Sequence, residues 1–154
     1  MNRPTIGLDL GTTSLGIAQS DSLGFVFGVE NFRFVKNQYV LARKRVHELV
    51  EETGIKEIVI GLPLHLSGQM SEMANNCVRF KDDLLKEDPS LHIEMFDERF
   101  STITADRSLN QRGVKGSKNK KESIDKIAAC VILDTYLRMK VILVQHLVII
   151  LLTQ

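Results

Sequence analysis

The chain has 154 residues and a mass of 17.4 kDa, with 20 Lys and Arg against 19 Asp and Glu, so its formal charge is +1. Hydrophobic residues make up 44% and charged residues 25%, which is ordinary for a globular protein and excludes bulk disorder, and the length fits one domain. A near-neutral average charge also argues against a basic nucleic-acid coat protein.

The two cysteines suit a reducing compartment. Cys77 and Cys130 are far apart and form no Cys-x-x-Cys pair, so we expect buried structural thiols and a cytoplasmic protein. No secretory signal pattern occurs at the N-terminus.

The first third of the chain predicts three antiparallel strands. Residues 6–10 have the pattern of a buried strand, residues 11–13 that of a tight turn, and residues 15–18 that of a strand paired back on the first. Alternating apolar positions between Phe25 and Phe34 predict the third strand, with Gly24 at its turn and Gly28 at a bend.

The rest of the chain predicts alternating helices and strands. Helical spacing over 42–53 is followed by Gly54 as a C-cap, and a second helix over 73–84 ends before Asp88 and Pro89. Residues 58–61 and 92–96 predict two buried strands. A short helix from Ser101 to about Leu109, a lysine-rich loop over 112–121 and a last helix, beginning near Ser123, complete the pattern.

These elements predict an α/β fold. Its mixed five-stranded sheet would have three antiparallel strands, then two parallel strands, and helices on both faces. We expect one domain over residues 1–140. The apolar run over 141–154 is a tail of unknown role, shorter than the roughly 20 residues of a membrane span. We therefore expect no membrane partner, and a packed terminal element or a partner surface in the tail.

Three carboxylates are candidate catalytic and metal-binding groups. Asp9 lies inside the first strand and Glu98 follows the fifth, so both belong to the sheet edge where ligands bind in such folds. Asp125 is expected in the first turn of the last helix, at the border of its apolar stripe. Carboxylates brought together attract hard cations such as Mg²⁺ or Mn²⁺, and two such ions can promote phosphodiester cleavage. The alternatives are a turn-capping Asp9 and an Asp125 stabilised by the helix dipole alone.

A cationic segment precedes Asp125. Residues 112–126 contain six basic and two acidic residues, a net charge of +4 that leaves −3 for the rest of the chain. Lys118, Lys120 and Lys121 are therefore candidate contacts to a nucleic-acid backbone. A solvated surface loop is the alternative interpretation.

Four motifs in order resemble the YqgF (RuvX) family of RNase H-like nucleases. They are Gly7-Leu-Asp-Leu-Gly-Thr12, Ile60-Gly-Leu-Pro-Leu64, Asp97-Glu-Arg-Phe-Ser-Thr102 and Ser123-Ile-Asp-Lys-Ile-Ala-Ala129. The family is described both as Holliday junction resolvases and as nucleases that process the 5′ end of pre-16S ribosomal RNA. The resemblance places its acidic positions on Asp9, Glu98 and Asp125, and implies a two-metal site and products with a 5′-phosphate and a 3′-hydroxyl.

The resemblance also suggests further substrate contacts and leaves alternative functions open. Thr12 and Arg99 join the three lysines as candidate contacts, whereas Thr13 and Ser14 stand where the family commonly has a Lys-Arg pair. The turn also resembles the phosphate-binding turn of sugar kinases and actin-like ATPases, although a second such half is lacking. A non-catalytic nucleic-acid-binding module is a further alternative. A symmetric dimer would suit junction cleavage, whereas a monomer would suffice for RNA trimming.

Overall fold

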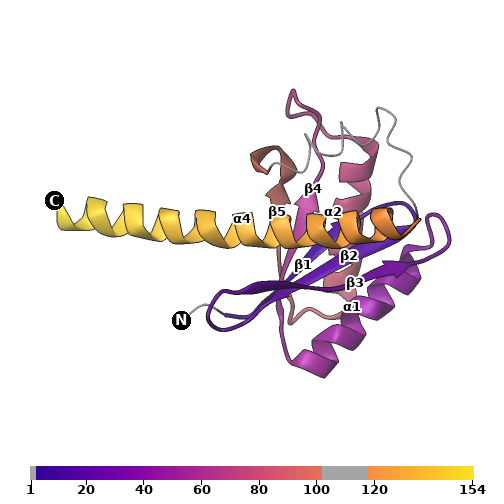
Figure 1. Cartoon of the computed structure of the whole chain (residues 1–154). Helices are drawn as coiled ribbons and strands as arrows, with labels where there is room; N and C mark the ends of the chain where they lie inside the picture. The colour runs from indigo at the N-terminus through magenta and orange to yellow at the C-terminus, as the bar shows by residue number, and fades with distance from the viewer. Residues whose placement is uncertain (1–2, 102–117) are drawn as a thin grey trace.

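The computed structural model describes residues 3–101 and 118–154, without the side chains of residues 118–125. Its centre is a five-stranded sheet in the order β3-β2-β1-β4-β5 (Figure 1). The strands are β1 (Thr5–Leu10), β2 (Ser14–Ser20), β3 (Val26–Arg33), β4 (Glu57–Leu62) and β5 (His92–Asp97). β1, β2 and β3 pair antiparallel, whereas β4 pairs parallel to β1 and to β5, which confirms the predicted mixed sheet.

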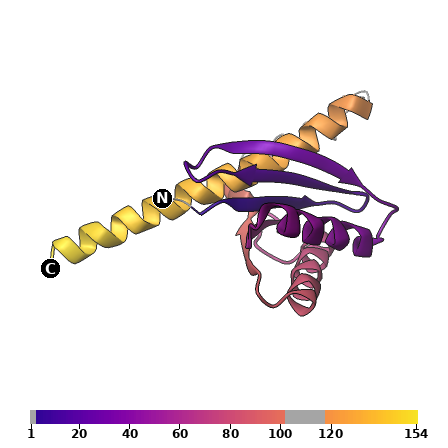
Figure 2. The same cartoon turned by 90° about the horizontal axis from the view of Figure 1, so that it is seen from below.

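The two faces of the sheet carry separate hydrophobic cores. Because side chains alternate along a strand, Leu8 and Leu10 of β1 point to one face, and Gly7 and Asp9 point to the other. Helices α1 (Tyr39–Thr53) and α2 (Glu72–Glu87) cover the first face, and α4 (Lys118–Leu152) crosses the second (Figure 2). Asp9 therefore lies on the α4 face.

The caps confirm the predicted end of α1 and place α2 close to its predicted limits, whereas α1 begins at Tyr39, three residues before the predicted start. Gly54 ends α1 with a left-handed φ of 74°, a conformation that glycine adopts without steric cost. Ser71 begins α2, where its hydroxyl accepts a hydrogen bond of 3.0 Å from the backbone N–H of Ala74. An ion pair of 2.6 Å between Arg43 and Glu87 joins the two helices at their exposed side.

Small residues let α4 approach the sheet closely. A Cβ on Gly7 would stand 2.7 Å from the Cβ of Leu133 and 3.3 Å from the carbonyl oxygen of Ala129, so this part of β1 needs glycine. Further along α4, the Tyr136 hydroxyl donates a 2.8 Å hydrogen bond to Glu94 of β5. Burial and this hydrogen bond raise the pKa of Tyr136, so the phenol stays protonated and continues to donate.

The last helix differs from its prediction at both ends. It begins at Lys118, so the backbones of Lys118, Lys120 and Lys121 are helical and do not belong to a loop. Asp125 therefore lies at the end of the second helical turn, beyond the first turn in which the dipole stabilises a negative charge, and that interpretation is wrong. The helix also continues without a break through the apolar tail to Leu152.

The other differences are small. Ser101 follows the short 3-10 helix η1 (Glu98–Phe100), and the helix predicted to continue to Leu109 lies outside the described residues. Cys77 is fully buried, as expected, but Cys130 on α4 is only half-buried. Burial raises the pKa of the Cys130 thiol. Within the described residues, no helix combines the length and apolarity that a membrane span requires.

Candidate active site

Asp9 is a buried carboxylate near the carboxyl end of β1. It is 6% exposed, and β1 is otherwise apolar around it. Removing a carboxylate from water is costly unless hydrogen bonds or cations compensate, so such a residue inside a strand indicates a function that requires it. It lies on the α4 face of the sheet, and its expected role at the functional edge stays a prediction.

Glu98 reaches the same edge from β5 and is 5% exposed. Its Oε1 would stand 2.5 Å from a Cβ on Gly61, so the carboxylate lies directly over the glycine of β4. Gly61 follows Ile60, which pairs with Leu8, so it lies beside Asp9 in the parallel register. The Glu98 carboxylate is therefore about one strand spacing, roughly 5 Å, from β1 at the level of Asp9.

Two buried carboxylates at the ends of nearby strands fit a hard divalent cation. Mg²⁺ and Mn²⁺ prefer carboxylate oxygens and water, and Mg²⁺ is usually held by one or two carboxylates. No group of three or more His, Cys, Asp and Glu side chains that could hold a metal occurs among the described residues. The predicted third ligand, Asp125, has its side chain outside the description, so the described residues supply two of the three predicted ligands.

The turn after β1 is rigidly held. Gly11 donates a backbone hydrogen bond of 2.8 Å to Ser14, which closes the turn. The segment after β3 supports it, because the backbone N–H groups of Phe34 and Asn37 donate bonds of 2.9 Å to the carbonyls of Thr13 and Thr12. Thr12 is exposed on this turn beside the Asp9 strand end, where a substrate phosphate could reach it.

Arg99 is held by its neighbour Asp97. Its Nη2 and Nε donate bonds of 2.7 and 2.9 Å to Oδ2 of Asp97, which hold the pKa of that carboxyl below its ordinary value. Its Nη1 donates a long bond of 3.4 Å to the carbonyl of Leu66 and lies against Gly68. Arg99 thus joins the end of β5 to the loop after β4, and its candidate role in binding substrate stays a prediction.

The structure adds Asn31, which the sequence analysis missed. Asp9 pairs with Gly16 and Gly16 pairs with Asn31, so the three residues form one row across β1, β2 and β3. The Nδ2 and Oδ1 atoms of Asn31 are buried and have no hydrogen-bond partner among the described residues. Asparagine is uncommon in strands, and its occurrence in a predicted strand is the only feature of the sequence that indicates a role for Asn31.

The predicted lysine contacts come from the N-terminal end of α4. The side chains of Lys118, Lys120 and Lys121 lie outside the described residues. Their helical backbones belong to the end of α4 that precedes Lys126, which packs against Gly28 of β3. Their proposed role therefore depends on sequence and charge.

Comparison with known proteins identifies the family. A family described as "RuvX: Holliday junction resolvase" matches residues 3–139. The chain belongs to the RuvX family.

Two relatives of this chain are similar to it over nearly their full length. A Fusobacterium nucleatum protein named "Putative pre-16S rRNA nuclease" is 35% identical over 135 residues, which cover 88% of this chain and 96% of the relative. A Geobacillus sp. protein of the same name is 39% identical over 136 residues, covering 88% and 97% of the two chains.

A solved structure agrees with the RNase H-like architecture. The structure titled "T. thermophilus RuvC in complex with Holliday junction substrate" matches 90% of this chain and 97% of that one, with a TM-score of 0.56 and 14% identity. At that identity the likeness shows the fold alone. The apolar tail beyond residue 139 lies outside the family match.

Proposed function

We propose that this protein is a metal-dependent endonuclease that hydrolyses phosphodiester bonds, with Asp9, Glu98 and Asp125 as catalytic residues. The observation that carries the proposal is the seating of the Glu98 carboxylate over Gly61, beside Asp9, in a chain of the RuvX family. Two carboxylates that are each about 95% buried carry a desolvation cost, which supports a metal-binding role over a module that only binds nucleic acid.

The carboxylates would hold Mg²⁺ or Mn²⁺. The metal would supply Lewis acidity and charge neutralisation at the phosphate under attack. Asp9, held in β1, and Glu98, held in η1 directly after β5, would orient that site, because both are largely excluded from water. Asp125 would complete the ligand set from α4.

The substrate contacts would surround this edge of the sheet. Thr12 lies on the rigid turn beside Asp9, and Arg99 sits after β5 next to Glu98. We add Asn31, because its buried carboxamide can both donate and accept hydrogen bonds in the row that contains Asp9. Lys118, Lys120 and Lys121 would bind the phosphate backbone.

We propose pre-16S ribosomal RNA, trimmed at its 5′ end in the cytoplasm, as the first substrate. The support is the name shared by relatives that are 35% and 39% identical over nearly their whole length. A Holliday junction is the second candidate, because the family match carries that description. Membership of this family disfavours the kinase-like alternative.

The catalytic assignment is tested by Asp9→Asn, which keeps the side-chain shape and removes the charge. We expect metal-dependent cleavage of precursor RNA to fall by at least about 100-fold, since a metal ligand is weakened. Asp82→Asn, on the exposed face of α2, is the matched control and should cleave as the wild type does. Full activity of Asp9→Asn would overturn the assignment.

The choice of substrate is tested by depleting the protein in cells and by cleavage assays in parallel. Accumulated ribosomal RNA precursors, together with cleavage of precursor RNA in vitro, would support the first candidate. Persistent recombination intermediates, together with symmetric cleavage of a four-way junction, would support the second. Cleavage of neither substrate by the wild type would support the non-catalytic alternative.

A further inference from the structure

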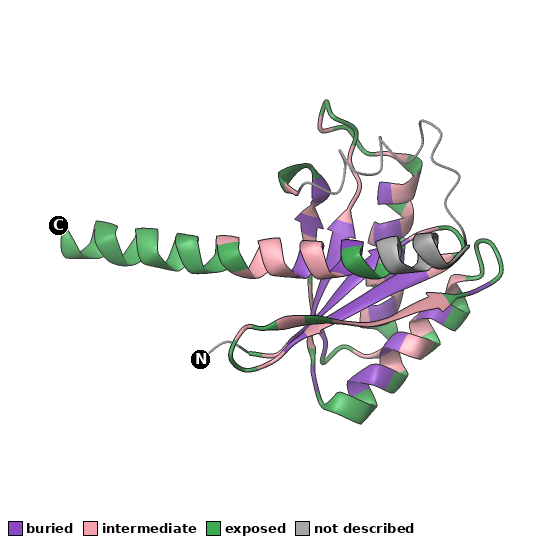
Figure 3. Cartoon of the chain, viewed as in Figure 1, coloured by how far each residue is buried: buried purple, intermediate pink, exposed green. Residues whose placement is uncertain are grey.

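The C-terminal part of α4 is an exposed apolar helix, which we call the tail and define as residues 141–152. The ten large aliphatic side chains in it are between 43% and 81% exposed (Figure 3). They are Val141, Ile142, Leu143, Val144, Leu147, Val148, Ile149, Ile150, Leu151 and Leu152. A helix that is apolar on all sides normally belongs in a buried environment.

The area is too large to leave uncovered. Ten half-exposed aliphatic side chains present apolar surface on the order of 1,000 Å², whereas the largest patch on a typical monomer is about 300–600 Å². A standard protein interface buries about 800 Å² on each partner. The tail alone thus offers the area that one side of a stable dimer needs.

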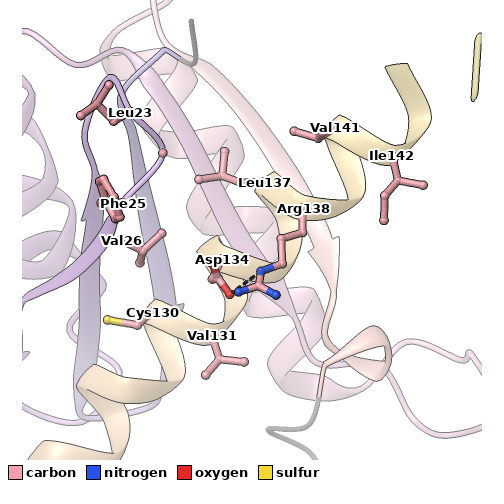
Figure 4. Close-up of a pocket in the computed structure, with 11 residues that line it drawn as sticks. Leu23, Phe25, Val26, Cys130, Val131, Asp134, Leu137, Arg138, Val141 and Ile142 are labelled. Carbon is pink, nitrogen blue, oxygen red and sulfur yellow. Dashed lines mark ion pairs between the residues drawn. The ribbon is translucent and has the colours of Figure 1, made fainter. Parts of the chain in front are cut away.

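A groove beside α4 continues this apolar surface. It has a volume of about 820 Å³ and lies between the β2–β3 turn and α4 (Figure 4). Leu23 and Phe25 line it from the turn and are 73% and 68% exposed, while Val131 and Leu137 line it from α4. Val141 and Ile142, the first residues of the tail, also line it, so the groove and the tail form one surface.

The tail cannot fill this groove in its own chain. α4 continues as one helix to Leu152, and the tail projects away from the sheet (Figure 1). At 1.5 Å per residue, the 12 residues of the tail extend about 18 Å, and the described part of this chain leaves both the tail and the groove open to a partner.

We propose that the tail and the groove form a homodimer interface, in which each copy lays its tail against the groove of its partner. A two-fold axis allows both tails and both grooves to be covered at once, because each copy carries both surfaces. No Asp, Glu, Lys or Arg occurs in residues 141–154, so the tail buries no charge of its own when it lies against the partner's groove. Because the family match ends at residue 139, the tail is an addition of this chain to the matched region.

The proposal is tested by measuring the mass of the full chain in solution by light scattering and sedimentation. We expect twice the chain mass of 17.4 kDa for the wild type. Leu147→Lys with Leu151→Lys places two charges on one side of the tail and should return the mass to that of one chain. Both positions are exposed in the monomer, 59% and 74%, so the fold should be retained, which circular dichroism checks.

Two further variants separate the proposal from general surface effects. Phe25→Lys alters the groove and not the tail, and it should also weaken the dimer. Leu66→Lys changes an equally apolar residue, 84% exposed in the loop after β4, and should leave the dimer intact. A wild type that is monomeric, or a dimer that survives the tail variant, would overturn the proposal. Binding of the monomer to phospholipid vesicles through the tail would do so as well.

Discussion

Gly61 is the residue on which the position of the Glu98 carboxylate depends. A Cβ there would stand 2.5 Å from Oε1 of Glu98 and 2.6 Å from Cδ1 of Ile132. Both distances are shorter than real contacts allow, so any side chain at this position must displace the Glu98 carboxylate and the end of the Ile132 side chain.

We therefore expect Gly61→Ala to reduce cleavage much more than stability. The Glu98 side chain can move away from the new methyl group, and the cleavage rate should fall by about 10-fold or more because catalytic geometry is sensitive to shifts of about 1 Å. The measurement is single-turnover cleavage together with thermal unfolding. Gly28→Ala on the same face of the sheet is the control, and it should leave cleavage unchanged. A fully active Gly61→Ala variant would mean that cleavage does not require the Glu98 carboxylate to lie over Gly61.

At the scale of single residues, the positions of Asp9 and Glu98 at strand ends could be predicted, and their surroundings could not. Asp9 and Glu98 stand out because carboxylates at buried strand ends carry a desolvation cost. Gly61 does not stand out, because a glycine in an apolar strand indicates only that something approaches closely. Which side chain approaches depends on the register of β4 with β1 and β5.

Among the elements, α4 makes the contacts that decide how the site is assembled. Its fit on the sheet depends on Gly7, where a methyl group would meet the Leu133 Cβ at 2.7 Å and the Ala129 carbonyl at 3.3 Å. These are backbone and near-backbone atoms of the helix, so relief requires the whole helix to shift.

We expect Gly7→Ala to lower the free energy of unfolding by about 1–3 kcal/mol, the usual cost of overpacking a core. Gly28→Ala also adds a methyl group beneath α4, but there it meets the side chain of the exposed Lys126, which can turn aside. Its cost should stay below about 1 kcal/mol. Urea denaturation of both variants gives the comparison. Equal losses would show that the helix adapts to Gly7→Ala without strain.

The elements with regular apolar spacing could be predicted from the sequence, and the start of α4 could not. Both α1 and α2 have a buried apolar face and a capping residue that mark them. The first turn of α4 is rich in lysine, which favours helix by propensity but gives no apolar period. Without that period, the segment was predicted to be a loop.

For the whole molecule, the net charge of +1 conceals an uneven distribution. Residues 112–126 carry +4, and the remaining chain carries −3. The carboxylates of the candidate site belong to both parts, and bound metal ions would neutralise them. The average charge therefore does not argue against a nucleic-acid partner.

This distribution predicts how binding depends on salt. Replacing Lys118, Lys120 and Lys121 together by Ala should weaken binding of precursor RNA and reduce the slope of log affinity against log salt. Each lost phosphate contact should reduce the slope by about 0.7–0.9. The measurement is a binding titration at several salt concentrations in an Asp9→Asn background, so that the RNA stays intact.

The control replaces Lys44, Lys81 and Lys86 on α1 and α2, which removes the same charge from the opposite face of the sheet. If Lys118, Lys120 and Lys121 contact the RNA backbone, only their replacement reduces the slope. Equal slopes in the two variants would show that the net charge, and not its location, determines binding.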